Sequence, residues 1–299
     1  MKNKIKVAVL GSTGYVGMEL VKILSNHSYV DINFLGSETI QGSYLSNIDN
    51  TKEYNQLPLL RPNNSFNTED SDYVFLALPH AVSNKYVKKY FNKIKIIDLS
   101  ADFRLDNFDV YKSNYGNEHE CKEYLKNFIY GLAEINRDKI LSSKNIAVPG
   151  CYPTSILLPL IPLIKNKLID TKNIIIDSKS GYSGAGRGVH KKYANKNLYE
   201  SLSAYGVGFH RHNSEIQQEI NNYTKKKFSF TFTPHLTPMF RGILSTIYVD
   251  LNKGVSIKKL ENTLNSQYSK NRFVKILKTN SLLSTNDVIN TNNCSIVIC

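Results

Sequence analysis

Residues 5–17 read IKVAVLGSTGYVG, a short apolar and β-branched run that leads directly into three glycines. The run predicts a buried strand, and the glycine spacing predicts a tight turn into a helix. Such a turn lets the backbone approach a phosphate that the helix N–H groups face, although an ordinary strand-to-helix turn is the alternative. The segment therefore predicts a dinucleotide site formed by Gly11, Ser12, Thr13, Gly14, Tyr15, Val16 and Gly17.

Four more apolar runs follow this turn, at residues 30–35, 72–78, 94–99 and 145–148, with helical stretches between them. This alternation predicts an α/β fold with a Rossmann-type doubly wound parallel sheet, in a first domain at 1–149. From 150 to 299 the pattern changes, because the strand-like runs at 174–178, 228–233 and 243–251 are separated by long gaps. We expect a second α+β domain there with a mainly antiparallel sheet, followed by an amphipathic helix that begins at Ser256.

The charge balance of the 299-residue chain is basic, with 38 Lys and Arg against 25 Asp and Glu, a net charge of +13. Most of the basic residues are lysines that scatter in pairs, which favours solvated faces over a nucleic-acid-binding surface. A positive field would still attract a small anionic substrate. No apolar run approaches the ~18 residues of a membrane span. We therefore expect a cytoplasmic protein with reduced thiols, no membrane partner and, because no Cys/His spacing resembles a zinc site, no metal.

Cys151 lies in the segment PGCYPT at 149–154, between a predicted strand and an apolar helical run. A thiol at a helix N-terminus is shifted toward the thiolate, which is the competent nucleophile. A buried structural cysteine is the alternative interpretation. The position of Cys151 at the carboxyl edge of a nucleotide-binding sheet, where ligands bind in such folds, favours catalysis.

Other polar segments carry candidate acid–base and anion-binding groups. The segment FHRHNSEI at 209–216 contains His210, His212 and Glu215, which offer acid–base groups and an orienting carboxylate, or else an ordinary polar helix start. Arg104, just beyond the strand at 94–99, suits a bidentate anion, with an ion pair to a nearby aspartate as the alternative. The glycine-rich loop at 180–188 would approach a flat ring, and its Arg187 could serve an anion.

The end of the second strand bears on the choice of cofactor. An acid at this place, here Glu38, binds a ribose 2′-hydroxyl and favours NAD, whereas the adjacent Ser37 suits the 2′-phosphate of NADP. The two residues favour different cofactors, so the choice between NAD and NADP stays open at this stage.

Seven motifs in order resemble the N-acetyl-gamma-glutamyl-phosphate reductases of arginine biosynthesis, over nearly the whole chain. They are GSTGYVG at 11–17, LPH at 78–80, DLSADFRL at 98–105, YGLAE at 130–134, PGCYPT at 149–154, SGYSGAGR at 180–187 and HRHNSEI at 210–216. Aspartate-semialdehyde dehydrogenase is a more distant relative.

The resemblance implies an NADPH-dependent reduction of an acyl phosphate to a semialdehyde through a thioester on Cys151. It implies that His210, or His212 in its place, is the acid–base group. It also implies roles in substrate binding for Ser100, Arg104, His212 and Glu215, and in cofactor binding for Ser37, Pro79, Ser183 and Gly184 besides the glycine turn. A homo-oligomer, dimer or tetramer, is expected.

The chain departs from the family pattern at three places. Glu38 stands where an arginine is usual, so NAD is not excluded beside NADP; Ser214 stands where a proline is usual. The family pattern also continues beyond the strand that matches 294–298 with another strand and a helix, so we expect a shortened C-terminal segment. Two further hypotheses remain: a lysine-pathway aminoadipyl-phosphate reductase of the same family, and a nucleotide-binding remnant with impaired catalysis.

Overall fold

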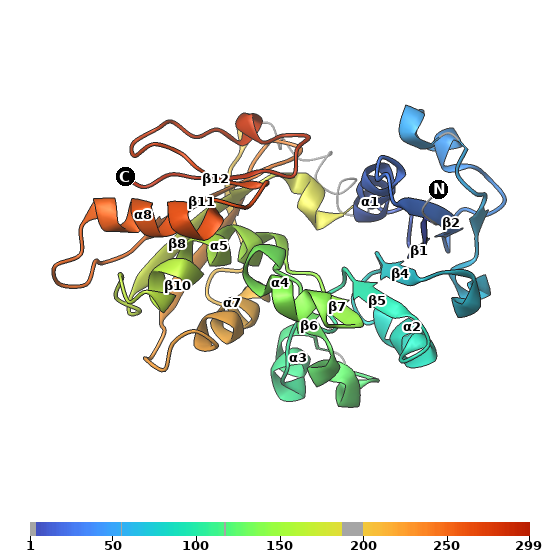
Figure 1. The fold of residues 1–299 in the computed structure, drawn as a ribbon, viewed down its shortest axis with the longest axis horizontal. Helices are drawn as coiled ribbons and strands as arrows, with labels where there is room; N and C mark the ends of the chain where they lie inside the picture. The colour runs from blue at the N-terminus through green and yellow to red at the C-terminus, as the bar shows by residue number, and fades with distance from the viewer. Residues whose placement is uncertain (1–3, 55, 117, 187–199) are drawn as a thin grey trace. The chain divides into compact units, whose positions relative to one another are not determined.

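The computed structural model describes residues 4–54, 56–116, 118–186 and 200–299. The chain divides into two compact units, Met1–Pro149 and Gly150–Cys299, which Figure 1 shows along the chain. Each unit is described below by itself.

Unit 1 is built on a seven-stranded parallel sheet with the strand order β3-β2-β1-β4-β5-β7-β6 (Figure 1). Its strands are β1 (Ile5–Leu10), β2 (Val30–Gly36), β3 (Leu60–Arg61), β4 (Tyr73–Leu76), β5 (Lys95–Asp98), β6 (Ile129–Tyr130) and β7 (Asn145–Ala147). Its helices are α1 (Tyr15–Ser25), α2 (Ser83–Tyr90), α3 (Phe108–Tyr115) and α4 (Ala133–Leu141), with 3-10 turns at η1 (Leu45–Asn47), η2 (Lys52–Tyr54), η3 (Asn63–Ser65), η4 (Thr68–Asp70) and η5 (Lys122–Asn127). The predicted Rossmann-type sheet is confirmed.

The strand order explains where a ligand can bind in unit 1. From β1 the chain moves outward through β2 and β3 and then returns to β4 on the other side of β1. In a doubly wound sheet, the reversal of direction leaves a crevice at the carboxyl ends of the strands that flank it. The glycine turn directly follows β1 and therefore lies at this edge.

Both faces of β1 are buried, which is why its sequence is a continuous apolar run rather than an alternating one. Val7 and Val9 pack into one core cluster with Val21 of α1. Ala8 and Leu10 pack into the opposite cluster with Tyr86 and Tyr90 of α2 and Phe103. The sheet is thus covered on both sides, and its carboxyl edge is the place left for polar chemistry.

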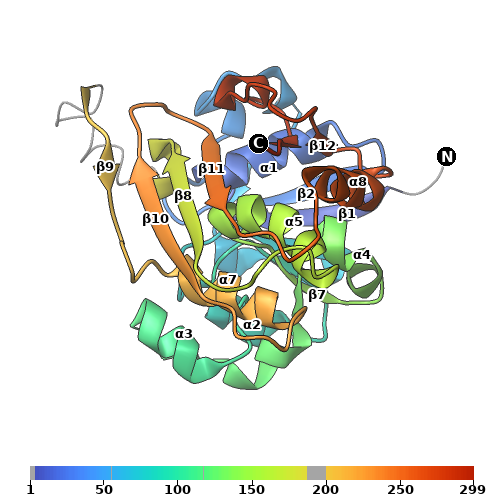
Figure 2. The same cartoon turned by 90° about the vertical axis from the view of Figure 1, so that its left-hand side faces the viewer.

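Unit 2 has a four-stranded mixed sheet with the order β11-β8-β10-β9. Its elements are α5 (Cys151–Lys165), β8 (Ile174–Ser180), η6 (Tyr182–Ala185), β9 (Ser203–Ala204), α7 (His212–Asn221), β10 (Phe230–Leu236), β11 (Ile243–Tyr248), α8 (Ile257–Tyr268), β12 (Val274–Ile276), η8 (Thr285–Asp287) and β13 (Cys294–Ile296). The β11–β8 and β10–β9 pairs are antiparallel, whereas the long central pair β10–β8 is parallel. Figure 2 shows β8, β10 and β11 side by side.

Helix α5 forms the core of unit 2 even though it contains Pro159 and Pro162. A proline inside a helix has no N–H for the carbonyl four residues earlier, so Pro162 leaves the Leu158 carbonyl without its helical donor. The hydroxyl of Tyr268, the last residue of α8, donates a hydrogen bond of 2.5 Å to this carbonyl oxygen. Helix α8 thereby packs on α5 at the point where the backbone of α5 needs a donor.

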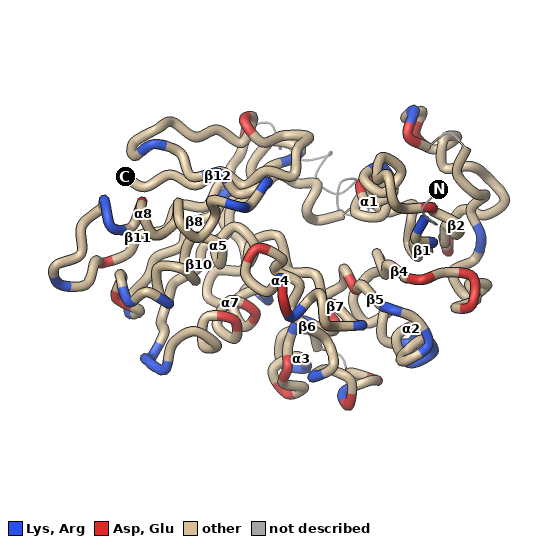
Figure 3. Tube along the Cα trace, in the orientation of Figure 1, with Lys and Arg blue, Asp and Glu red and all other residues tan. Residues whose placement is uncertain are grey.

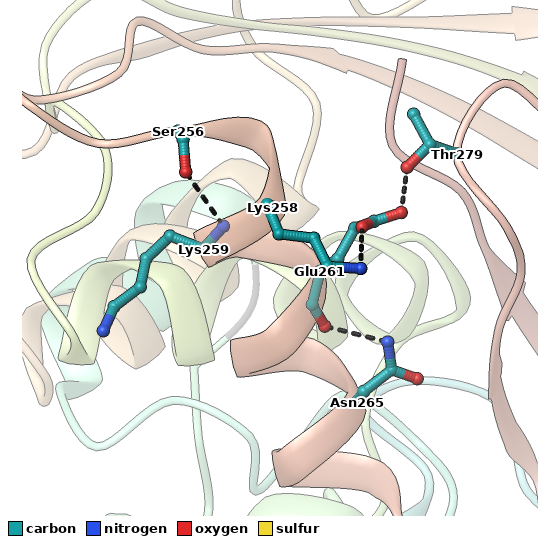
Figure 4. Close-up of polar contacts among 6 residues, drawn as sticks. All are labelled: Ser256, Lys258, Lys259, Glu261, Asn265 and Thr279. Carbon is teal, nitrogen blue, oxygen red and sulfur yellow. Dashed lines mark hydrogen bonds and ion pairs between the residues drawn. The ribbon is translucent and has the colours of Figure 1, made fainter.

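Helix α8 begins as the sequence predicts, with Ser256 as its N-cap (Figure 4). The Ser256 hydroxyl accepts the Lys259 N–H at 3.3 Å, which satisfies one of the first amide groups of the helix. One turn later, the carboxylate of Glu261 accepts from Lys258 at 3.1 Å and from the Thr279 hydroxyl. These contacts tie the start of α8 to the turn that follows β12.

The close packing of α1 against the glycine turn of unit 1 can be tested by a substitution. A methyl group on Gly17 would lie 2.2 Å from the Gly11 carbonyl oxygen and 2.8 Å from the Ser12 Cα, both backbone atoms. We predict that Gly17→Ala lowers the free energy of unfolding by about 1–3 kcal/mol, because α1 must move away from the turn. Urea denaturation of the full chain measures this change.

Gly14→Ala is the matched control, because the nearest atom to its methyl group, the Gly11 carbonyl oxygen, would be 3.6 Å away. This variant should keep the stability of the original chain. Equal midpoints for the Gly17 and Gly14 variants would contradict the steric argument.

Candidate active site

The candidate residues fall into two groups, one in each unit. The glycine turn, Ser37, Pro79, Ser100 and Arg104 belong to unit 1. Cys151, Ser183, Gly184, His210, His212 and Glu215 belong to unit 2. Arg187 lies outside the described residues.

The glycine turn is held by its own side chains and by β2. Ser12 is buried, and its hydroxyl and its N–H both donate to the Gly36 carbonyl, at 3.0 and 2.9 Å. Thr13 and Ser37 share a hydrogen bond of 3.0 Å between their hydroxyls. Helix α1 then starts from the exposed N-cap Gly14 with no acidic residue in its first turn. An N-terminus of this kind, without a competing carboxylate, suits an anion.

Asn63 also holds this turn, although the sequence did not indicate it. Its side chain is buried at the start of η3, and its Oδ1 accepts the Gly11 N–H at 3.1 Å. The same oxygen would lie 2.2 Å from a methyl group on Gly36, so Gly36 must be a glycine for Asn63 to reach the turn. No local pattern marks Asn63, because its partner is about fifty residues away in the chain.

Glu38 accepts a hydrogen bond from a residue of α2. Its Oε1 accepts a hydrogen bond of 3.0 Å from the Tyr86 hydroxyl. Burial, and next to it this bond with Glu38, raises the pKa of Tyr86, so the phenol remains the donor. The carboxylate is thus anchored at the end of β2, close in sequence to Ser37, whose hydroxyl also accepts the Ile40 N–H at 3.2 Å.

The segment that follows β5 is hydrogen-bonded to a strained turn that follows β4. Ala81 has a φ of +63°, a left-handed conformation that is unfavourable for a residue with a side chain. The Asp102 Oδ1 accepts the Ala81 N–H at 2.9 Å and the Tyr111 hydroxyl at 2.9 Å. The Ala101 N–H in turn donates to His80 Nδ1 at 3.1 Å. The turn that carries the exposed Pro79 is therefore fixed by the segment at 100–104.

Ser100 belongs to a buried carboxylate network. Its hydroxyl donates to Asp98 Oδ2 at 2.7 Å and its N–H donates to Asp98 Oδ1 at 3.2 Å. Burial of Asp98 raises its pKa to about 6, and the bonds from Ser100 partly offset this effect. Ser100 is itself 1% exposed. In this structure it therefore stabilises a buried acid at the end of β5.

Arg104 is 8% exposed and binds the backbone. Its Nε donates to the Val148 carbonyl at 2.7 Å, and its Nη2 donates to the Leu99 carbonyl at 3.1 Å. The guanidinium group therefore ties the end of β5 to the segment after β7, three residues before Cys151 in the chain. The predicted contact of Arg104 with an anion stays a prediction.

Cys151 is the first residue of α5 and its side chain is exposed. The helix begins from Gly150, and no acidic residue lies in its first turn. The Gly150 carbonyl accepts the N–H and the hydroxyl of Thr154, at 3.0 and 2.9 Å. An exposed sulfur at the positive end of a 15-residue helix is a favourable place for an anionic thiolate.

Glu215 fixes the turn in front of Cys151. The Glu215 side chain is 1% exposed, and its Oε1 accepts the Gly150 N–H at 2.8 Å. A buried carboxylate on a backbone N–H is a strong, charge-assisted contact. The sequence predicted Glu215 as an orienting group for the substrate or His210, and in the structure its carboxylate accepts a hydrogen bond from the backbone next to Cys151.

His210 and His212 lie in an aromatic cluster with Tyr152, the residue that follows Cys151 in the chain. Their rings are 4.9 Å apart, and the ring of Tyr152, the residue after Cys151, is 5.5 Å from His210 and 5.9 Å from His212. The Tyr152 hydroxyl is 2.9 Å from the Tyr205 hydroxyl. Burial, with a smaller contribution from Arg211, lowers the pKa of His210 to about 4. The structure thus places both predicted histidines in the neighbourhood of Tyr152.

The glycine-rich loop of unit 2 is fixed by backbone contacts to the segment before β11. The N–H groups of Tyr182 and Ser183 donate to the carbonyls of Met239 and Phe240, at 3.1 and 3.0 Å. Gly184 is exposed, and a methyl group there would meet only the Ser180 hydroxyl oxygen, at 3.7 Å. The loop therefore leaves open space at Gly184, whereas the backbone of Ser183 is hydrogen-bonded.

Within the described residues, no group of three or more His, Cys, Asp and Glu side chains is arranged to hold a metal ion. Among the same residues, no helix has the length and apolar character needed to cross a membrane. Lys and Arg are dispersed along both units, with acidic residues present in each (Figure 3).

Family models match both units. The model described as "Semialdehyde dehydrogenase, NAD binding domain" matches residues 6–143. The model described as "Semialdehyde dehydrogenase, dimerisation domain" matches residues 151–299. Solved structures agree on the fold: aspartate semialdehyde dehydrogenase II from Vibrio cholerae has a TM-score of 0.75 at 15% identity, covering 98% of this chain and 87% of that one. The Candida albicans enzyme, described with NADP, has a TM-score of 0.65 at 15% identity, covering 95% and 85%.

Curated relatives are more similar in sequence. An N-acetyl-gamma-glutamyl-phosphate reductase of Vesicomyosocius okutanii is 43% identical, over 98% of this chain and 86% of its own length. The Clostridium botulinum protein of the same name is 42% identical, over 98% and 85%. A probable chloroplastic one of Arabidopsis thaliana is 40% identical, over 97% and 72%. The resemblance of the sequence motifs is confirmed, and the chain belongs to the N-acetyl-gamma-glutamyl-phosphate reductases, within the semialdehyde dehydrogenase family.

Proposed function

We propose that this oxidoreductase reduces N-acetylglutamyl 5-phosphate to N-acetylglutamate 5-semialdehyde and phosphate, a step of arginine biosynthesis, through a thioester on Cys151. The observation that carries the proposal is the exposed Cys151 sulfur at the first position of α5, behind a Gly150 N–H held by buried Glu215. The relatives named above supply the substrate class. Such a thiol needs a reducing compartment, which supports a cytoplasmic location.

The chemistry follows from the residues of the chain. The Cys151 thiolate attacks the acyl carbon, and the carbon–oxygen bond to phosphate breaks, leaving a thioester and free phosphate. A nicotinamide cofactor held by the residues of the glycine turn would supply the hydride that the thioester carbon needs. The resulting alkoxide re-forms the carbonyl as the carbon–sulfur bond breaks, which releases the aldehyde and restores the thiolate. Ser100, Arg104, His212 and Glu215 are the proposed substrate-binding residues, of which Arg104 and Glu215 also fix the backbone around Cys151.

The residues of unit 1 fit a dinucleotide cofactor. Gly11 and Gly17 leave no room for a side chain between the turn and its neighbours, and the first turn of α1 carries no acid. We propose that the turn at 11–17 holds the pyrophosphate, with Ser37 at the ribose, Pro79 along the crevice, and Ser183 and Gly184 of unit 2 at the nicotinamide. The proposed cofactor is NADP, and Glu38 limits the preference because its charge repels a 2′-phosphate.

Replacement of Cys151 tests the covalent step. We predict that Cys151→Ser lowers the phosphate-dependent reduction of NADP by N-acetylglutamate semialdehyde about a thousandfold or more, because a serine hydroxyl is a far weaker nucleophile. Cys299→Ser is the matched control, since Cys299 is also an exposed cysteine. Retained turnover in the Cys151 variant would exclude the thioester. A preference of the original chain for a carrier-linked aminoadipyl phosphate over the acetylated glutamyl substrate would instead indicate the lysine pathway. Cofactor binding without turnover in the original chain would indicate the impaired remnant.

Glu38→Gln tests the cofactor preference. The amide keeps an oxygen acceptor for Tyr86 and removes the charge, so we predict that the ratio of kcat/KM for NADPH over NADH rises about tenfold. Glu69→Gln, which removes another exposed carboxylate from unit 1, should leave the ratio unchanged. An equal ratio in the original chain and Glu38→Gln would show that Glu38 does not face the ribose.

The mixed sheet of unit 2 supports a homo-oligomer, dimer or tetramer. Ile175 of β8 and Tyr248 of β11 form a cross-strand pair, and they are 50% and 58% exposed. The alternate residues of β8, Ile174 and Ile176, are buried on the opposite face. Paired apolar side chains on an open sheet face are typical of an interface.

We predict that Tyr248→Asp shifts the assembly toward the monomer, because it would bury a carboxylate in an apolar contact. Sedimentation velocity at micromolar concentration measures the change. Ile257→Asp, on the 44% exposed Ile257 of α8, is the control. An unchanged sedimentation coefficient for Tyr248→Asp would place the interface elsewhere.

A further inference from the structure

The carboxylate of Glu38 reaches from the end of β2 to helix α2. Its partner there is Tyr86, which is 2% exposed and packs in the core cluster on the α2 side of the sheet with Ala8 and Leu10. The Tyr86 hydroxyl emerges from this core and donates to Glu38 Oε1 at 3.0 Å. Residues that are 48 positions apart in the chain are thereby joined next to the end of β2.

The ring of Tyr86 is held in place by its neighbours. Its centroid is 6.0 Å from that of Tyr90, one turn later on α2, and the Lys85 ammonium group lies 5.0 Å from it. Burial, and next to it the hydrogen bond with Glu38, raises the pKa of Tyr86, so the phenol stays protonated at neutral pH. Tyr86 is therefore a fixed hydrogen-bond donor.

Asn63 connects this donor to the glycine turn. Its Oδ1 accepts the Gly11 N–H at 3.1 Å. Its side-chain amide also acts on Tyr86, where it lowers the pKa of the phenol as a hydrogen-bond donor, against the larger effects of burial and Glu38. Asn63 is 1% exposed. The turn that suits a pyrophosphate and the carboxylate at the end of β2 are thus linked through two buried side chains, Asn63 and Tyr86.

Glu38 itself is exposed, and an exposed glutamate ordinarily samples several rotamers. Among the residues that the structure describes, Tyr86 is the hydrogen-bond partner of its carboxylate, through Oε1. The second oxygen, Oε2, is left for a ligand. A carboxylate that is held by one oxygen keeps the other in a defined place.

This geometry matters at the ribose of a dinucleotide. An acid at the end of the second strand accepts a hydrogen bond from a ribose 2′-hydroxyl, and its charge repels a 2′-phosphate. Both effects depend on how long the carboxylate stays at the ribose. If the side chain is free to turn into water, both effects become weaker.

We propose that Tyr86 is a positioning residue that determines cofactor specificity, because it holds the Glu38 carboxylate at the ribose and so limits the preference for a 2′-phosphorylated dinucleotide. The inference rests on the proposed function, since it concerns the cofactor of that reaction. It deepens that function by naming the residue that sets the choice of cofactor. No sequence motif indicated Tyr86.

Equilibrium binding of NADPH and NADH to the full chain, followed by the fluorescence of the nicotinamide, tests this role without turnover. We expect Tyr86→Phe to raise the ratio of Kd for NADH over Kd for NADPH about fivefold, the effect of one hydrogen bond. NADH should bind more weakly and NADPH more tightly. A purely structural role of Tyr86 would instead weaken both dinucleotides by the same factor.

Tyr90→Phe is the matched control. Tyr90 lies on the same helix and in the same core cluster, and it is 1% exposed. Its buried hydroxyl has no hydrogen-bond partner among the described residues. Removal of this hydroxyl should leave the ratio of the two dissociation constants unchanged.

Two further variants separate the position of the Glu38 carboxylate from its charge. Because Tyr86 acts through Glu38, adding Tyr86→Phe to Glu38→Gln should leave the ratio within about twofold of that of Glu38→Gln alone. Glu38→Asp keeps the charge, but its carboxylate is one carbon shorter and loses its reach to Tyr86. We expect this variant to shift the ratio toward NADPH, as Tyr86→Phe does. Position 38 is exposed, so Glu38→Asp decides the question even if Tyr86→Phe does not fold.

Several results would overturn the proposal. An unchanged ratio in Tyr86→Phe would do so, and a shift toward NADH would show that Tyr86 draws the carboxylate away from the ribose. Additive effects of Tyr86→Phe and Glu38→Gln, or a ratio in Glu38→Asp equal to that of the original chain, would also contradict it.

These outcomes are distinct from a failure of the proposed function. An original chain that binds both dinucleotides without turnover would contradict the proposed reaction, while the ratios would still decide the role of Tyr86. Turnover with a ratio that Tyr86→Phe does not move would contradict the role of Tyr86 alone. Binding of neither dinucleotide by the original chain would contradict both.

Discussion

The hydrogen bond between the Gly150 N–H and the buried carboxylate of Glu215 is the contact on which the proposed chemistry of unit 2 depends. It fixes the residue from which α5 starts and hence places the Cys151 sulfur at the positive end of the helix. On the preceding side of the chain, Arg104 and Asp98 hold Val148 through its carbonyl and its N–H, at 2.7 and 2.8 Å. The backbone before Cys151 is therefore held at both ends by hydrogen bonds to buried groups.

Buried polar groups perform a similar task at the nucleotide edge of unit 1. Asn63 holds Gly11, and Asp102 holds Ala81 in its left-handed conformation. Unsatisfied or ionised groups are costly in an interior, so such residues persist where they fix backbone that side-chain packing cannot hold. The backbone of the crevice edge is thus held by contacts within the protein, and such preorganisation reduces the ordering cost of binding.

The aromatic enclosure of His210 follows a different principle. Rings of Tyr152, Tyr205 and Phe232 exclude water, and exclusion of water disfavours the imidazolium. The pKa of His210 is accordingly lowered to about 4, with a smaller contribution from the neighbouring charge of Arg211.

The sequence by itself determined the family, the Rossmann-type sheet, the five longer strands of unit 1, the Ser256 cap and the candidate nucleophile, because these depend on local periodicity and on contiguous motifs. It did not predict the two-residue strands β3 and β6, whose pairing comes from neighbouring strands rather than from their own residues. The parallel pairing of β8 with β10 was likewise hidden, since strand direction depends on the path of the chain between them.

Only the tertiary structure decided the partners of the polar side chains. It connected Glu215 to Gly150, Asn63 to Gly11, and Tyr205 to Tyr152 and His210, across separations of about fifty residues or more in most cases. A hydrogen bond or a ring contact depends on distance and direction in space, which residue order does not encode. The chemical identity of the site could therefore be predicted from the sequence, and the state of its groups had to come from the fold.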